Sequence, residues 1–191
     1  MVDGITKKSV AAMLGTIIGV VFSGAFALIF GQVTSITGYN VSDIENLVYV
    51  GEMTDIKKIG ELLFAGILIA SLGAVMDVGM SIASTLNELK EQNPQMMLKE
   101  LFQSGMNVGR DMMGTMTNTL ILAFTGGSIN TLVFIFAYNY EYQQVINMYS
   151  VGIEIMQGLS SSLGVIMAVP VTSWIAAIFY IVKIKNKEKT P

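Results

Sequence analysis

Two short series of polar residues stand out in a chain that is otherwise strongly apolar. The first begins at Asp77, and Ser81, Ser84 and Glu88 follow it along the chain. Their spacing of four, seven and eleven residues places all four side chains on one face of a helix. A carboxylate in the middle of an apolar helix is costly in a membrane and marks ion paths and proton relays. The sequence therefore predicts that Asp77 is an ion-coupling residue and that Ser81 lines the same path.

The second series consists of Arg110, Asp111, Thr115 and Asn118, again at helical spacing. If the two helices are antiparallel neighbours, Thr115 and Asn118 reach about the depth of Asp77, with Arg110 and Asp111 nearer the cytoplasm. We expect Arg110 to bias the charge of Asp77, since a nearby cation favours a charged carboxylate. The two series together predict a translocation path for protons or cations. The alternative is a buried polar network that only locks the two helices together.

Two other chemistries fit these residues less well. An intramembrane aspartyl protease needs two carboxylates at one depth, whereas Asp77 and Asp111 are expected at different depths. Copper(I) binding is suggested by Met112, Met113 and Met116, but the chain has no Cys and no His. Methionine more often fills gaps in apolar packing. We therefore expect no enzyme, no metal site and no cofactor.

The elements that position these residues are expected to be membrane-spanning helices. The 191 residues are 52% hydrophobic and 13% charged, against about 25% charged in soluble domains. Several windows, each longer than the roughly 20 apolar residues that a span needs, carry no charge or only that of Asp77. These windows are residues 9–42, 62–87, 112–140 and 155–182. With 11 basic and 14 acidic residues, the chain also shows no patch for nucleic acid.

The pattern predicts an all-α fold, a polytopic transmembrane bundle that forms a single membrane domain over residues 1–191. Residues 32–60 are polar and are expected to form a loop outside the membrane. Four spans are expected, at about residues 10–31, 61–87, 107–126 and 159–183.

Two connecting segments are expected to lie at the membrane surface. Asn93 and Pro94 are typical of a helix start and predict an amphipathic cytoplasmic helix over 94–104. Residues 128–158 are expected to form a re-entrant or interfacial elbow on the outer side. If Ile129–Tyr149 crosses the membrane instead, the bundle has five spans.

Basic residues favour the arrangement with four spans. In it, nine of the eleven Lys and Arg residues lie on one side, and only Lys57 and Lys58 lie on the other. Basic residues accumulate on the cytoplasmic side of membrane proteins. Both termini are therefore expected in the cytoplasm.

The first span carries a small residue at every fourth position, including Gly15, Gly19 and Ser23. Such a face lets another helix approach closely, which drives helix packing in lipid. Gly15, Gly19 and Ser23 are therefore expected to form a helix-packing interface. The helix that packs there belongs either to the same chain or to a second subunit, which would make a homo-oligomer.

Several motifs resemble the YibE/F-like integral membrane protein family, and the resemblance covers most of residues 9–182. It implies a permease-like protein of the bacterial plasma membrane. Many members are longer, with an extracytoplasmic domain and further spans, so this chain is similar to the shorter F-type members. The resemblance thus implies a sister membrane subunit of the E type as a partner, besides the lipid bilayer. The motifs are Leu72–Ser84, Ser104-Gly105, Gly109–Asp111, Gly114–Leu120 and Val169–Thr172.

A fainter similarity of pattern links the chain to the membrane half of the Sec accessory protein SecF and of RND transporters. There too, an Asp-bearing span leads to a short cytoplasmic helix, a span that opens near Gly-Arg, and a Gly-Gly break. This similarity implies proton-driven transport with Asp77 and Arg110 in the coupling site. The expected function is a subunit of a membrane transporter, and the alternative is a scaffold subunit that stabilises a partner membrane protein without transport.

Overall fold

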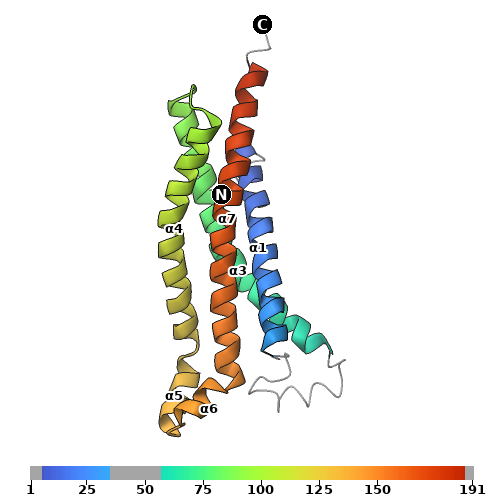
Figure 1. Ribbon diagram of the computed structural model, residues 1–191, viewed down its shortest axis with the longest axis vertical. Coiled ribbons are helices and arrows are strands. Elements are labelled where there is room, and N and C mark those ends of the chain that lie inside the picture. Colours follow the sequence, from blue (N-terminus) through green and yellow to red (C-terminus); the bar gives the residue numbers. More distant parts are fainter. Residues whose placement is uncertain (1–5, 35–56, 188–191) are drawn as a thin grey trace.

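The computed structural model describes residues 6–34 and 57–187, and these residues form helices and turns with no strand among them. Four long helices run side by side (Figure 1): α1 (Lys7–Val33), α3 (Lys57–Gln92), α4 (Leu98–Gly127) and α7 (Tyr149–Lys187). Helix α7 packs against each of the other three. Two short helices, α5 (Ile129–Ala137) and α6 (Tyr142–Ile146), lie at the end of the bundle opposite the α3–α4 turn. The prediction of an all-α helical bundle is confirmed.

Three helical segments in the described residues are long and apolar enough to cross a membrane: Lys8–Val33, Phe64–Gln92 and Tyr149–Ile181. Helices α4 and α5 meet this criterion only as a pair, and they are bent by 52° at the break between them. The bundle thus has three candidate spans, or four if the bent pair crosses as one. Helix α5 is about 14 Å long at 1.5 Å per residue, too short to form a fifth span by itself.

The predicted start of the amphipathic helix at residue 94 is wrong. Asn93 and Pro94 lie in the turn after α3, and α4 begins at Leu98. The backbone N–H of Met97 donates a hydrogen bond of 2.8 Å to the Glu100 carboxylate. This contact satisfies one of the free N–H groups at the helix start. The start is therefore fixed by an acidic side chain inside the helix and not by the asparagine before it.

The predicted separation between a helix over 94–104 and a third span over 107–126 is also wrong. Helix α4 is continuous from Leu98 to Gly127. Its residues Leu101, Gly105 and Gly109 are buried on one face. This face continues across the predicted break, and its packing explains why the helix does not stop there.

The elbow predicted over 128–158 is shorter in the structure, because α7 already begins at Tyr149. Ile153 and Met156 are buried in the first turns of α7, and Met156 packs in a small cluster with Ala27 and Ile67. This packing extends α7 about ten residues beyond the predicted span start. The loop predicted over 32–60 falls largely on residues 35–56, which lie outside the described residues.

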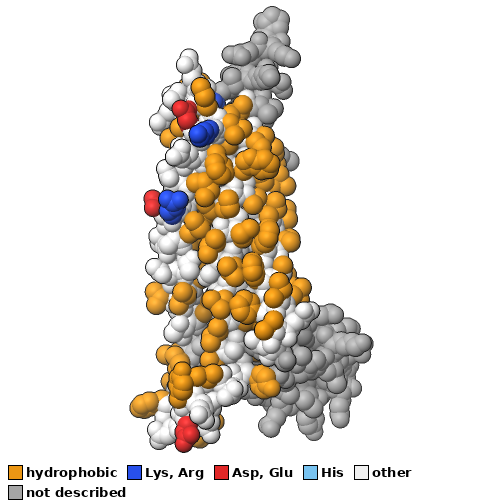
Figure 2. Space-filling model, viewed as in Figure 1, with side chains coloured by type: hydrophobic (Ala, Val, Ile, Leu, Met, Phe, Trp, Pro, Cys, Tyr) orange, Lys and Arg blue, Asp and Glu red, His pale blue; other side chains and the backbone are white. Residues whose placement is uncertain are grey.

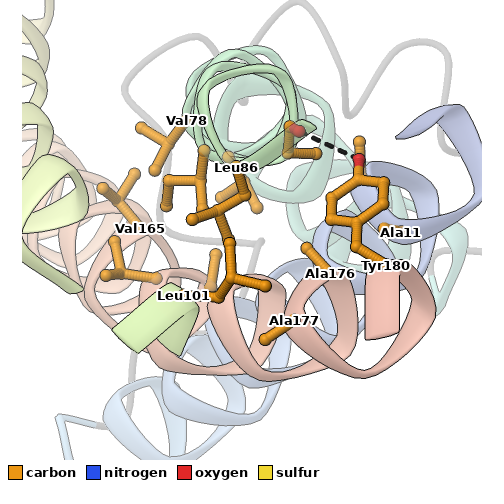
Figure 3. Packing of buried hydrophobic residues seen from close by; sticks show 14 residues of the cluster. Ala11, Val78, Leu86, Leu101, Val165, Ala176, Ala177 and Tyr180 are labelled. Atoms are coloured by element: carbon orange, nitrogen blue, oxygen red, sulfur yellow. Dashed lines mark hydrogen bonds between the residues drawn. The ribbon is translucent and has the colours of Figure 1, made fainter. Parts of the chain in front are cut away.

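The main apolar core lies between the four long helices. Its buried members include Ala11, Val78, Leu86, Leu101 and Val165 (Figure 3). In the same cluster, the hydroxyl of Tyr180 donates a hydrogen bond of 2.9 Å to the carbonyl oxygen of Ala83, drawn as the dashed line in Figure 3. This buried bond joins α7 to α3.

Candidate functional site

Asp77 lies on the outer face of α3. Val75 and Val78 are fully buried in the core, whereas Asp77 is exposed on the opposite side of the helix. Gly73, one turn earlier on the same side, has no atom within 4 Å of the position that a Cβ would take. The outer face of α3 is therefore open around Asp77.

The other polar residues of this series follow Asp77 toward the α3–α4 turn. Ser81 and Ser84 are half-buried, and Glu88 is exposed. The hydroxyl of Thr85 bonds back to the carbonyl oxygen of Ser81 at 2.9 Å. The series therefore runs along the outside of α3 from its middle to its end, as one helical face.

The second series lies on the outer face of α4. Arg110, Asp111, Thr115 and Asn118 are all exposed. Gly114 lies among them, and a Cβ at Gly114 would meet no atom within 4 Å. This half of α4 therefore has no covering element in the described part of the chain.

Two further polar residues on α4 belong to the same face and were missed in the sequence. Gln103 and Asn107 are exposed and precede Arg110 at helical spacing. The spacing was visible in the sequence, but Gln103 fell in the predicted surface helix over 94–104 and Asn107 at the start of the predicted third span over 107–126. Because α4 is continuous, the polar face is longer than predicted.

The hydroxyl groups on this face bond to their own helix. The Thr115 hydroxyl donates to the carbonyl oxygen of Asp111 at 3.2 Å, and the Thr119 hydroxyl donates to that of Thr115 at 2.9 Å. Serine and threonine commonly satisfy themselves in this way in helices. Within the described residues, the exposed side chains of Asp77, Arg110 and Asp111 make no hydrogen bond.

The two series lie at matching levels but not face to face. A Cβ on Gly105 would lie 3.1 Å from Leu86, and a Cβ on Gly109 would lie 3.2 Å from Ile82. Continuing this antiparallel register by one turn brings Gly114 to the level of Asp77. The helices meet through these glycines and leucine or isoleucine side chains, while both polar series point away from the contact. The expected facing of Asp77 onto the Arg110–Asn118 series within one chain is therefore not found.

The same geometry bears on the two other chemistries. Asp77 and Asp111 lie on the outer faces of different helices, and no contact joins them in the described residues. Met112, Met113 and Met116 are half-buried and pack against the main core. These methionines act as apolar packing residues.

The small residues of α1 pack against α7 of the same chain. A Cβ on Gly19 would lie 2.9 Å from the Cβ of Ala168, and a Cβ on Gly164 would lie 2.8 Å from Ser23. Gly15 approaches Thr172 so closely that a Cβ there would overlap its side chain. The face of Gly15, Gly19 and Ser23 is thus covered inside the chain.

The surface divides into two kinds. In Figure 2, apolar side chains cover the face formed by α1 and α7, and the charged side chains in view lie along the α4 edge and toward the ends.

The comparison with protein-family models then decides what the chain is: the model described as YibE/F-like protein matches residues 1–182.

The chain belongs to the YibE/F-like protein family. No curated protein and no solved structure matched the chain. The matched region includes both polar series and the α1–α7 contact. In this YibE/F-like chain, the candidate site is therefore a polar face on the outside of α3 and α4 rather than a cleft between them.

Proposed function

We propose that this chain is a subunit of a membrane transporter and that another subunit covers the outer faces of α3 and α4. The observation that carries the proposal is the exposure of Asp77, Arg110 and Asp111 on an otherwise apolar bundle. A charged side chain at the bilayer centre costs about 2.5–3.5 kcal/mol on insertion scales. A partner that offers counter-charges, hydrogen bonds or trapped water removes this cost.

The position of Asp77 along α3 supports a mid-membrane depth. It lies near the middle of the apolar part of α3, about 20 Å from Phe64 and about 16 Å from Glu88 at 1.5 Å per residue. A side chain at this depth is too short to reach either aqueous surface. We therefore expect the partner to contact α3 within the membrane as well as at its ends.

The residues around the charges favour a path over a sealed contact. Gly73 and Gly114 leave open space beside Asp77 and Asn118. Small residues and hydroxyl groups on the facing sides of two subunits can enclose a narrow polar passage. In the proposal, Asp77 carries the proton or cation, Arg110 and Asp111 set its charge, and Ser81, Thr115 and Asn118 line the passage.

The second candidate is a scaffold that stabilises a partner without transport. It is favoured by the threonine hydroxyls of α4, which are satisfied by their own helix and need no transported ion. In that case, the charges pair permanently with the partner. The two candidates differ in whether Asp77 must remain ionisable.

We further propose the partner and the orientation. The partner is a sister subunit of the E type with an extracytoplasmic domain, in the bacterial plasma membrane. The start of α1, the α3–α4 turn and the end of α7 lie at one end of the bundle, which carries Lys8, Lys90 and Lys99. The distribution of basic residues favours a cytoplasmic location for this end and thus for both termini.

The decisive test is Asp77→Asn, which keeps the shape of the side chain and removes its charge. Everted membrane vesicles that contain the assembled complex are energised, and the pH gradient is followed by acridine-orange quenching while a panel of cations and organic solutes is added. We expect at least one solute to release the quenching with the native protein, and the variant to lose this response while the complex is recovered in normal amount.

Glu88→Gln is the matched control, because Glu88 is exposed on the same face but at the aqueous end of α3. It is expected to retain the response. If Asp77→Asn also retains the response, Asp77 does not couple transport. If no solute acts on the native complex and Asp77→Asn loses the partner, the scaffold function is correct.

A further inference from the structure

A cavity of about 410 Å³ lies at the end of the bundle that carries α5. It is lined by the last turns of α4, the start of α5 and the first half of α7. Its volume falls in the range of small-molecule sites, roughly 300–1,000 Å³. The cavity is therefore large enough for a bound organic molecule.

The bend between α4 and α5 creates this space. Helix α5 turns away from α4 by 52° after Gly126 and Gly127, so it does not continue along α7. Opposite the bend, α7 has Gly158, and a Cβ at this position would lie 3.6 Å from the ring of Phe124. The cavity is thus a product of the backbone path and not of a loosely packed core.

Most of the cavity surface is apolar, and large apolar side chains come from all three helices. They include Ile121 and Phe124 from α4, Leu132 from α5, and Ile155 and Leu159 from α7. The hydroxyls of Thr125 and Ser128 at the wall bond to the carbonyl oxygens of Ile121 and Phe124, at 2.8 and 2.9 Å. The lining also contains the hydroxyls of Thr117, Thr131, Ser150 and Ser162, but apolar atoms make up most of the cavity surface.

Glu154 is the one charged residue in the lining. It is half-buried, and the sequence contains no Lys or Arg between Arg110 and Lys183. The segments that form the cavity therefore supply no counter-charge. A half-buried carboxylate without a counter-charge favours a cationic group of the ligand.

The order of groups along α7 matches an amphiphile in a membrane. Glu154 lies near the start of the helix, about 8 Å from Tyr149 at 1.5 Å per residue, whereas Leu159 and Ser162 lie one and two turns deeper. A molecule with a charged head and an apolar body would place its head at Glu154 and its body against Phe124 and Leu159.

We propose that the cavity between α4, α5 and α7 binds a lipophilic cation, with the positive charge at Glu154 and the apolar body between α4 and α7. The inference does not rest on the transporter proposal, because the two sites share none of their proposed residues. An ammonium on an apolar body comes either from a free amphiphile or from the ethanolamine headgroup of a membrane lipid.

Tetraphenylphosphonium and tetraphenylborate are a matched pair of probes, since they have nearly the same size and shape and opposite charge. Binding of each is measured by equilibrium dialysis on the full chain in phosphatidylglycerol nanodiscs, and the binding to empty nanodiscs of the same lipid is subtracted. We expect the cation to bind at least about tenfold more tightly than the anion, which is the effect of one favourable charge interaction. Equal binding of the two probes would overturn the proposal.

Glu154→Gln is expected to remove the preference for the cation while the fold is retained. Glu141→Gln is the matched control, because Glu141 is an exposed carboxylate at the same end but outside the cavity lining. Gly158→Leu is expected to fill the cavity and weaken both probes. Unchanged cation binding in Glu154→Gln would contradict the site.

Nanodiscs that contain phosphatidylethanolamine distinguish the two sources of the ammonium group. If the lipid headgroup is the occupant, phosphatidylethanolamine displaces tetraphenylphosphonium from the native chain, and Glu154→Gln abolishes this competition. If a free amphiphile is the occupant, the lipid has no effect on binding of the probe. Loss of all cation binding when the partner subunit is present would show that the partner fills the cavity, which overturns the proposal.

Discussion

The α1–α7 contact and the outer face of α4 are built from similar residue types but have opposite surroundings. Gly19 and Ser23 are buried against α7, whereas Gly114 and Asn118 on α4 are exposed. Residues 9–33 of α1 contain no charge, while the α4 face carries Arg110 and its neighbour Asp111. A small-residue pattern shows that a helix can be approached closely, but the charges indicate which face lacks its partner within the chain.

The largest expected effect comes from filling the closed contact. Gly19→Leu places a side chain where Val75, Ala168 and the backbone oxygen of Gly164 already lie within 2.6–3.1 Å of the Cβ position. Overpacking against side chains typically costs about 1–3 kcal/mol, and the cost is larger here because the Gly164 backbone cannot move aside as a side chain does. We expect little or no folded protein by size-exclusion chromatography in detergent.

Gly114→Leu is the counterpart on the open face, where a Cβ meets no atom within 4 Å. The isolated chain should fold normally with this substitution, and only its association with the partner should suffer. Equal loss of folded protein in both variants would remove the distinction between the closed and the open face.

The next effect concerns the charges of the open face. Arg110→Ala removes a charge that we expect to be paired with the partner in a desolvated contact, and truncation of such a group costs about 2–5 kcal/mol. The affinity for the partner, measured by microscale thermophoresis in detergent, should fall by at least about thirtyfold. Lys99→Ala, at the start of the same helix, should change it little, and a similar loss in both variants would contradict this account.

The smallest effect tests the hydrogen bond inside the closed part of the bundle. Tyr180→Phe removes the donor to the Ala83 carbonyl and leaves the ring packing in place. The net cost of one such bond is about 0.5–1.5 kcal/mol. A small drop in the unfolding temperature is expected, with Tyr142→Phe on the exposed α6 as a neutral control. An equal drop in both variants would show that the bond does not stabilise the bundle.

The fold class was predictable from the sequence because long windows without charge indicate membrane-spanning helices. The ends of the helices did not follow so well. Helix α4 continues through Gly105 and Gly109 because these glycines pack on α7, a contact between residues far apart in the chain. Helix α7 begins at Tyr149 because of buried contacts near its start. Tertiary packing, which local patterns do not contain, decided both boundaries.

Only part of the candidate site was predictable, again because local patterns do not contain tertiary packing. The spacing after Asp77 predicted a single helical face, and the structure has the residues of that series along the outside of α3. Periodicity cannot tell which neighbour covers a helix face. The sequence therefore wrongly predicted that the polar faces of α3 and α4 face each other. The sequence signalled the break at Gly126 and Gly127 but not the cavity at Glu154, since the cavity also depends on how α7 packs beside the bend between α4 and α5.

The central claim is that another subunit covers the exposed polar face of α4 inside the membrane. The chain contains no cysteine, so Gly114→Cys and Ile17→Cys each give one unique site for a spin label. Ile17 is exposed on the apolar side of α1 and serves as the lipid-facing reference. The collision rate of the spin label with dissolved oxygen is measured by electron paramagnetic resonance. The protein for this measurement is purified from its native membrane. We predict low oxygen accessibility at position 114 and high accessibility at position 17, and equally high values at both positions would contradict the claim.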